Sequence, residues 1–235
     1  MDETGLFDRL IPRYSVLLPT EDKKAVRGKI VKKEMVTLTV CSNATGSHKI
    51  PIQIIGKPKR PACIIGREWS VHYCSQNNAW MRTPTFMLWF DDIFYPNVAQ
   101  KTSEPVSLLL DNATGHGKEF TRNNVTVKFF PPNVTSWKQP MDMGIIAALK
   151  KRYKYILLKE IINFYDLPEE IKLERIETRE RLRRGSTGVH YGNSATLLDT
   201  ANFVVEAWDA ITASTLTNSF GKAEIISSWK VSFKR

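Results

Sequence analysis

The sequence predicts an α/β fold, because strand-like and helix-like segments alternate along a chain of 235 residues. Two β-rich runs, at 35–41 and 50–55, precede an aromatic segment with helical spacing at 83–94. A short apolar run at 106–110 precedes another strand-like run at 125–130. Hydrophobic residues make up 42% of the chain, which is ample for a packed core.

The first two strands are expected to form a hairpin, because the segment NATGSHK between them is polar and contains glycine. Thr83-Pro84 then starts a helix, since proline is favoured in the first turn. Asp91 and Asp92 lie within this helix, but adjacent helical positions point about 100° apart, which argues against a metal pair. The apolar face of the helix is predicted to be core: Phe86, Trp89, Phe90, Ile93 and Phe94.

The continuous apolar run at 106–110 predicts a strand covered on both faces, and it stops at Asp111. A carboxylate at the C-terminal edge of such a strand lies where open α/β sheets place ligands. The alternative is a structural turn made by Asp111 and Asn112. The following loop, ATGHGKE, does not have the spacing of a nucleotide-binding P-loop.

Pro140 begins the next predicted helix, whose first turn contains Asp142. The helix dipole favours an ionised carboxylate there, so Asp142 is either a metal ligand or a helix cap. A basic cluster follows within the next turns and is either a solvated helix face or a clamp for a phosphate backbone. It consists of Lys150, Lys151, Arg152 and Lys154.

The C-terminal third changes in composition. Residues 169–184 alternate acids and bases, as in a charged helix or linker, and 197–211 again shows helical spacing. We therefore expect a catalytic core at 1–165, a charged helix or linker at 166–190 and a helical C-terminal tail at 191–235.

The net charge of +10, from 34 Lys and Arg against 24 Asp and Glu, favours a polyanionic partner. No apolar run approaches the ~18 residues of a transmembrane helix, so we expect DNA rather than a membrane. Cys41, Cys63 and Cys74 are odd in number and, with His48 and His72, match no zinc-site spacing. They are expected to be buried or half-buried thiols.

Three short motifs each contain one aspartate: DETGLF at Asp2, LLLDNA at Asp111 and QPMDMG at Asp142. A pair of Mg²⁺ ions roughly 3.5–4 Å apart needs hard oxygen ligands from several segments, and it serves phosphodiester chemistry. The three aspartates are therefore candidate metal ligands and candidate catalytic residues.

The same motifs carry a family resemblance. Together with NNAWMRTPTFMLWF, SLLLDNATGH and FFPPNVTSWKQPMDMGIIAALKKRY, they resemble the DDE superfamily endonuclease domain of pogo, Tigger and jerky transposases. Centromere-binding protein B belongs to this group. The resemblance implies an RNase H-like mixed sheet flanked by helices, in which Asp2, Asp111 and Asp142 hold two Mg²⁺ or Mn²⁺ ions. It also implies a nuclear protein that acts on DNA, with room for a homo-oligomer on DNA and with no small-molecule cofactor.

Two functions remain open at this point. The first is metal-dependent DNA cleavage and strand transfer, and the alternative is a degenerate or host-adopted core that binds DNA or a protein without cutting. Family members usually carry helix-turn-helix domains and a few strand residues before the D-E-T-G motif. Because only Met1 precedes Asp2, we expect a missing first strand, a frayed Asp2 and weak nicking.

Overall fold

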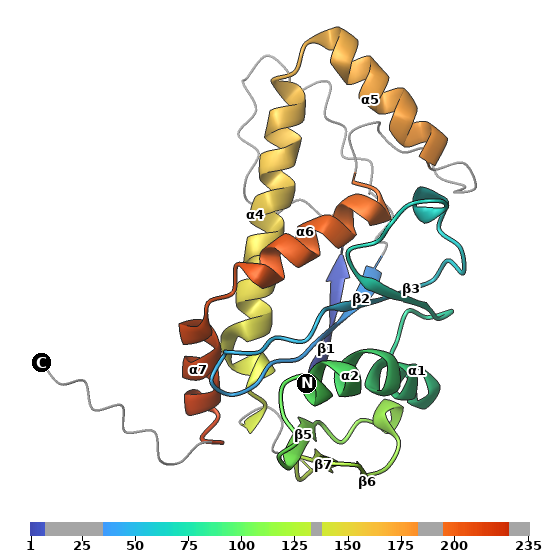
Figure 1. Ribbon diagram of the computed structural model, residues 1–235. Helices are drawn as coiled ribbons and strands as arrows, with labels where there is room; N and C mark the ends of the chain where they lie inside the picture. The colour runs from blue at the N-terminus through green and yellow to red at the C-terminus, as the bar shows by residue number, and fades with distance from the viewer. Residues whose placement is uncertain (8–34, 133–137, 183–194, 226–235) are drawn as a thin grey trace, which may run out of the picture.

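The computed structural model describes residues 1–7, 35–132, 138–182 and 195–225, which form mixed sheets flanked by helices. The four-stranded sheet has the order β1-β2-β3-β4 (Figure 1). The first three strands pair antiparallel and the fourth pairs parallel to β3. The strands are β1 (Asp2–Phe7), β2 (Met35–Val40), β3 (Gln53–Gly56) and β4 (His72–Ser75).

The second sheet has three strands in the order β5-β7-β6, formed by β5 (Val106–Leu110), β7 (Val125–Phe129) and β6 (Phe120–Arg122). β5 and β7 run parallel, as expected for two strands of an α/β sheet. The nitrogen of Met1 donates a hydrogen bond of 3.0 Å to the carbonyl of Leu109, so the start of β1 contacts the edge of β5.

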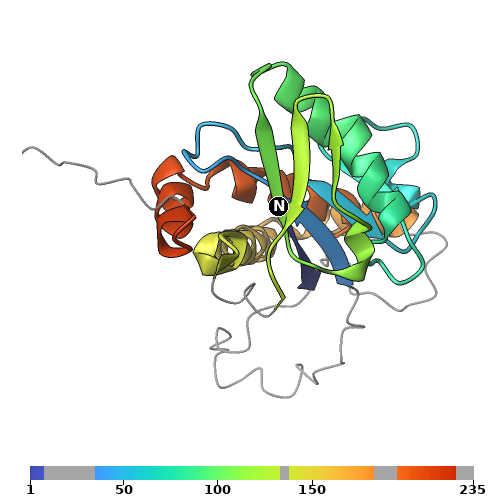
Figure 2. The same ribbon diagram turned by 90° about the horizontal axis from the view of Figure 1, so that it is seen from below.

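The predicted aromatic helix is confirmed. It comprises α1 (Thr83–Trp89), a π-helical turn at Phe90–Phe94 and α2 (Tyr95–Ala99). Its apolar face packs on buried side chains of β5 and β7 to form one of two cores, and Figure 2 shows α1 and α2 beside this sheet.

The helix predicted after Pro140 is also confirmed, as a π-helical turn at Met141–Ile145 followed by α4 (Ile146–Tyr165). In Figure 2, α4 lies on the opposite side of the sheets from α1 and α2. Two later helices, α6 (Leu197–Asp209) and α7 (Ala213–Lys222), share a core with α4 and the four-stranded sheet. The charged segment forms helix α5 (Glu169–Leu182), which lies away from the sheets (Figure 1).

The predicted hairpin is confirmed and is anchored to α6. Lys49, in the turn, donates to the carbonyls of Trp208 and Asp209 at the end of α6 and to that of Ile211 just beyond it. The indole of Trp208 donates in return to the carbonyl of Ile50, at 3.1 Å. These bonds fix the C-terminal helices against the sheet that carries Asp2.

One detail of the strand prediction is wrong. β5 is not covered on both faces: Leu108 and Leu110 are buried, whereas Ser107 is exposed. The strand alternates in burial because only the face with Leu108 and Leu110 packs in the core that contains the aromatic helix. Among the described residues, no helix is both long and apolar enough to cross a membrane.

Candidate active site

Asp2 lies at the beginning of β1, which corrects the expectation that the first strand is missing. The DETGLF motif pairs with β2 along its whole length, from Asp2 opposite Val40 to Phe7 opposite Met35. Asp2 is buried, with 7% of its surface exposed, and its Oδ1 accepts a hydrogen bond of 2.7 Å from the amide of Glu3. The ladder therefore holds Asp2 in place, so the expectation of a frayed ligand is also wrong.

Asp111 follows directly after β5, as predicted, but its principal partner was not foreseen. The Nδ1 atom of His116 lies 2.9 Å from Oδ1 of Asp111 and 3.1 Å from its main-chain carbonyl. Both residues belong to the loop that follows β5, and a short helical turn at Thr114–His116 directs the ring back toward the strand. The carboxylate of Asp111 also accepts a hydrogen bond from the backbone of Ala113, so the structural turn and the contact with His116 are both present.

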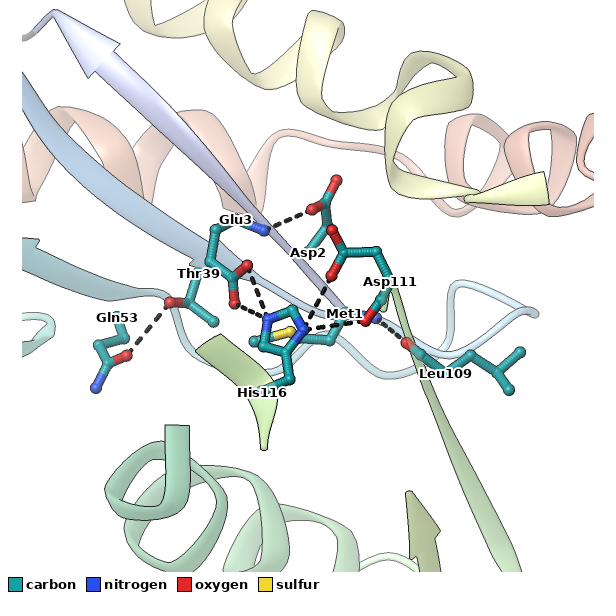
Figure 3. Close-up of polar contacts among 8 residues, drawn as sticks. All are labelled: Met1, Asp2, Glu3, Thr39, Gln53, Leu109, Asp111 and His116. Atoms are coloured by element: carbon teal, nitrogen blue, oxygen red, sulfur yellow. Dashed lines mark hydrogen bonds and ion pairs between the residues drawn. The ribbon is translucent and has the colours of Figure 1, made fainter. Parts of the chain in front are cut away.

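His116 also binds Glu3, from the opposite side of the ring (Figure 3). Its Nε2 atom lies 3.0 Å from both carboxylate oxygens of Glu3, and the side chain is 1% exposed. Burial by itself lowers the pKa of His116, but hydrogen bonds to Asp111 and Glu3 outweigh it and raise the pKa to about 10. The ring is therefore a cation at neutral pH. We call Glu3, His116 and Asp111 the histidine bridge.

Sequence reasoning missed Glu3 and His116. Glu3 stands beside the first aspartate, and His116 lies five positions after the second, in a loop considered only as a phosphate cradle. The feature of the sequence that could have indicated this contact was a histidine shortly after a strand that ends in aspartate. Such a histidine does not predict a functional role until its partner on β1 is known.

Asp142 lies in the π-helical turn that precedes α4, and it interacts with the other two aspartates. Asp142 is exposed at one side, but partial burial, followed by the charge of Asp111, raises its pKa. Burial, the charge of Asp142 and the charge of Glu3 raise the pKa of Asp2 to about 7. The pKa of Asp111 instead is lowered, chiefly by its hydrogen bond from His116. The three predicted aspartates thus influence one another's ionisation, and we call them the acidic site.

The four predicted basic residues lie on α4 and differ in their relation to the acidic site. Lys150 is half-buried, and Asp142 and Asp2 favour its charged form, although burial and the neighbouring Lys154 together lower its pKa. Lys151, Arg152 and Lys154 are exposed. Since positions four apart share a helix face, Lys154 lies on the side of Lys150, while Lys151 and Arg152 point elsewhere.

The chemistry of the acidic site suits a hard divalent cation. Carboxylate oxygens from separate segments are the ligands that Mg²⁺ and Mn²⁺ prefer, and the raised pKa values of Asp2 and Asp142 reflect negative charge that a cation would balance. Within the described ranges, no three His, Cys, Asp or Glu side chains are already gathered tightly enough to hold an ion. The cysteines are free thiols, Cys41 and Cys63 buried and Cys74 half-buried, as predicted.

Comparison with known proteins identifies the family, since residues 33–220 match the DDE superfamily endonuclease family. The chain belongs to the DDE superfamily endonucleases. The resemblance seen in the sequence is therefore confirmed, and it extends to the pogo, Tigger and jerky group.

Three relatives illustrate the relationship of this DDE domain. It is 38% identical over 155 residues to the human Jerky protein homolog, a match covering 61% of the chain and 27% of that protein. It is 33% identical over 191 residues to CENP-B homolog protein 2 of Schizosaccharomyces pombe, a match covering 74% of the chain and 33% of that protein. It is 27% identical over 222 residues to mouse Tigger transposable element-derived protein 4, a match covering 94% of the chain and 38% of that protein. The chain thus spans about a third of the length of these relatives, and no solved structure matches it.

Proposed function

We propose that this DDE domain binds DNA and cleaves its phosphodiester bonds with two Mg²⁺ or Mn²⁺ ions held by Asp2, Asp111 and Asp142. The observation that carries the proposal is that Asp142 interacts with both Asp2 and Asp111, which brings together carboxylates from three separate parts of the chain. A carboxylate that is paired with a cation for structural reasons usually has a lowered pKa. The pKa values of Asp2 and Asp142 are instead both raised, which is typical of functional sites.

In this proposal the residues of the site have different roles. Asp2 and Asp142 would supply carboxylates whose charge the nearby cations do not fully balance, and Asp111 would be oriented by the protonated ring of His116. When bound, the two ions would supply Lewis-acid stabilisation of the attacking and leaving oxygens, first for strand cleavage and then for strand transfer. Lys150, beside Asp2 and Asp142, is placed to contact a phosphate next to the scissile bond.

The fold we propose for the full catalytic core is RNase H-like. Support comes from the mixed sheets, the antiparallel β1-β2-β3 set and the contact of Met1 with the parallel strand β5. We also retain as a proposal the division into a core at 1–165, a charged segment at 166–190 and a C-terminal segment at 191–235.

DNA is the partner that the surface charge supports. The net charge is +10, and the basic face of α4 begins within two turns of Asp142. The proposed contacts to the DNA backbone are Lys150, Lys151, Arg152 and Lys154. We also propose that the protein is nuclear and forms a homo-oligomer on DNA.

A second function is binding without cleavage. A relative 32% identical over 170 residues is named ARS-binding protein 1, and its name describes binding alone. In that case the acidic site would be a remnant, and the charge of α4 would account for the activity of the domain.

Mg²⁺-dependent nicking of supercoiled plasmid DNA separates the two functions. Nicking that requires Mg²⁺ or Mn²⁺ and is lost in Asp142→Asn supports the endonuclease. DNA binding with no nicking in either metal, by a protein that calorimetry shows to bind the metal, would support the second function.

A further inference from the structure

The loops that follow β3 and β4 lie side by side. The two strands run parallel and pair in register up to their last residues, so both loops begin at the same edge of the sheet. The amide of Gln76 donates a hydrogen bond of 2.8 Å to the carbonyl of Gly56, which joins the start of one loop to the start of the other. We call residues 57–60 and 76–82 the loop surface.

The loop surface is positively charged. Lys57, Lys59, Arg60 and Arg82 are exposed, and neither loop contains Asp or Glu. Within the described ranges, none of these four side chains takes part in an ion pair. Their charge is therefore available to a polyanion.

Trp80 projects from this surface on a fixed backbone. Its side chain is 64% exposed, whereas the preceding residue, Ala79, is fully buried. Oε1 of Gln76 accepts hydrogen bonds from the amides of Asn78, at 2.6 Å, and Trp80, at 3.2 Å. Ala79 has a φ of 54°, a left-handed conformation that a residue other than glycine keeps only where its surroundings hold it. The loop thus presents the indole to solvent from a defined position.

The loop surface adjoins the acidic site through the turn that carries His116. A Cβ atom on Gly115 would lie 2.8 Å from the carbonyl oxygen of Met81, so these two backbones are closely packed. The ring of Phe86, on α1, also contacts His116, with 5.5 Å between the ring centroids. Because His116 binds Asp111, the loop surface begins next to the acidic site.

The loop surface is separate from the basic residues of α4. In Figures 1 and 2 the segment between β3 and α1 lies on the other side of the molecule from the beginning of α4. Lys150, on α4, interacts with Asp142 and Asp2, whereas the loop surface is reached through His116 and Asp111. The two basic surfaces therefore flank the acidic site.

We propose that the loop surface binds single-stranded DNA beside the acidic site, with one base stacked on Trp80. Cations attract the phosphates of any nucleic acid, whereas an exposed indole can stack only on a base whose face is open. In an intact duplex the neighbouring base pairs cover these faces. The surface thus selects a strand that is unpaired over one that is fully paired. This inference rests on the proposed function in that the ligand is DNA, but it does not depend on cleavage.

The test measures DNA binding without divalent metal, so that no cleavage intervenes. The fluorescent probes are a blunt duplex, the same duplex with a five-nucleotide thymine tail, and the same duplex with an abasic tail of equal length. We expect the parent to bind the thymine tail about 10-fold more tightly than the abasic tail, because only the former offers a base for stacking. Trp80→Ala should lose this preference, and Trp80→Phe should keep most of it.

A matched control tests whether any exposed aromatic residue beside lysines would act in this way. Tyr155, on α4, is 68% exposed and follows Lys154. Tyr155→Ala should keep the preference for the thymine tail. The thermal midpoint of each variant shows that it is folded.

The phosphate contacts are tested by the salt dependence of binding to the thymine-tailed probe. Lys57→Gln and Lys59→Gln should each lower the slope of log affinity against log salt by about 0.7, the value for one contact to a single strand. Lys101 is exposed and precedes β5, at the opposite end of this strand from Asp111, so Lys101→Gln should leave the slope unchanged.

Three outcomes would overturn the proposal. If the parent binds both tails equally, or if folded Trp80→Ala keeps the preference, no base stacks on Trp80, while binding of the blunt duplex still supports the proposed function. If Trp80→Ala weakens binding to all three probes by the same factor, Trp80 contacts the duplex instead. If the parent binds none of the probes, the proposed function fails together with this inference.

Discussion

The two parts of the acidic site differ in how their negative charge is balanced. Asp111 belongs to the histidine bridge, where a buried cation binds it and its pKa is lowered. Asp2 has the amino group of Met1 nearby and Asp142 has Lys150, but burial and neighbouring carboxylates outweigh these cations and raise both pKa values. The fold thus fixes one aspartate by itself and leaves the other two with charge that a bound cation would balance.

The largest expected effect comes from removing a carboxylate from either part. We expect Asp111→Asn or Asp142→Asn to abolish Mg²⁺-dependent nicking, a loss of ~10³-fold or more, because several kcal/mol of charge stabilisation are lost. DNA affinity should stay the same or rise, since a negative charge facing phosphate is removed. Plasmid nicking and a binding titration measure the two quantities. Nicking at the parent rate in either variant would show that the site is misassigned.

The histidine bridge should make a large contribution to the stability of the fold. We expect His116→Gln to destabilise the protein by about 3 kcal/mol, because it leaves Glu3 and Asp111 without their buried cation. The exposed His72 on β4 provides the control, and His72→Gln should change stability little. Denaturant unfolding of the two variants compares them, and equal stability would mean that the bridge is dispensable.

The bridge also predicts a pH dependence. The folded state raises the pKa of His116 from 6.5 to about 10, so its stabilisation is complete below pH 6.5 and is lost as the pH rises toward 10. The stability difference between the parent and His116→Gln should shrink over this interval. A difference that is constant from pH 6 to pH 10 would show that the ring is neutral in the fold.

The other part of the site should respond to pH in a lower range. The pKa of Asp2 is raised from 3.8 to about 7, so protonation favours the folded state, and this contribution disappears as the pH rises through 7. Without metal, the parent should lose more stability than Asp2→Asn between pH 4 and pH 8, and Mg²⁺ should raise the thermal midpoint of the parent at pH 8. Asp92→Asn, on the exposed face of the aromatic helix, is the control and should behave as the parent. Equal Mg²⁺ stabilisation of Asp2→Asn would remove Asp2 from the ligand set.

The smallest effects are expected from single lysine substitutions on α4. We expect duplex DNA to bind with little sequence preference, and affinity to fall by about 10³-fold between low and physiological salt if roughly six phosphates are contacted. Lys150→Gln and Lys154→Gln should each lower the salt dependence by about one phosphate contact, and more than Lys151→Gln does. Affinity that is flat with salt would contradict an electrostatic mode.

Much of the fold follows from local pattern. The hairpin around NATGSHK, the aromatic helix after Thr83, the strands at 106–110 and 125–130 and the helix after Pro140 all depend on period and turn residues, which neighbours in sequence specify. Each of the three candidate aspartates lies where such an element begins or ends. DETGLF was not recognised as a strand, since its alternation of Thr4 and Leu6 is short and interrupted by Gly5.

The sequence by itself determined the α/β class and the family, and it singled out Asp2, Asp111 and Asp142 as candidate ligands. Only the tertiary structure decided that Glu3 and Asp111 share His116, although Glu3 and His116 are 113 positions apart. It also decided that Ser107 lies on the edge strand of the sheet formed by the described residues, beside a cavity. The physical reason is that hydrogen bonds and burial between distant segments depend on sheet order and register, which the spacing of residues along the chain does not encode.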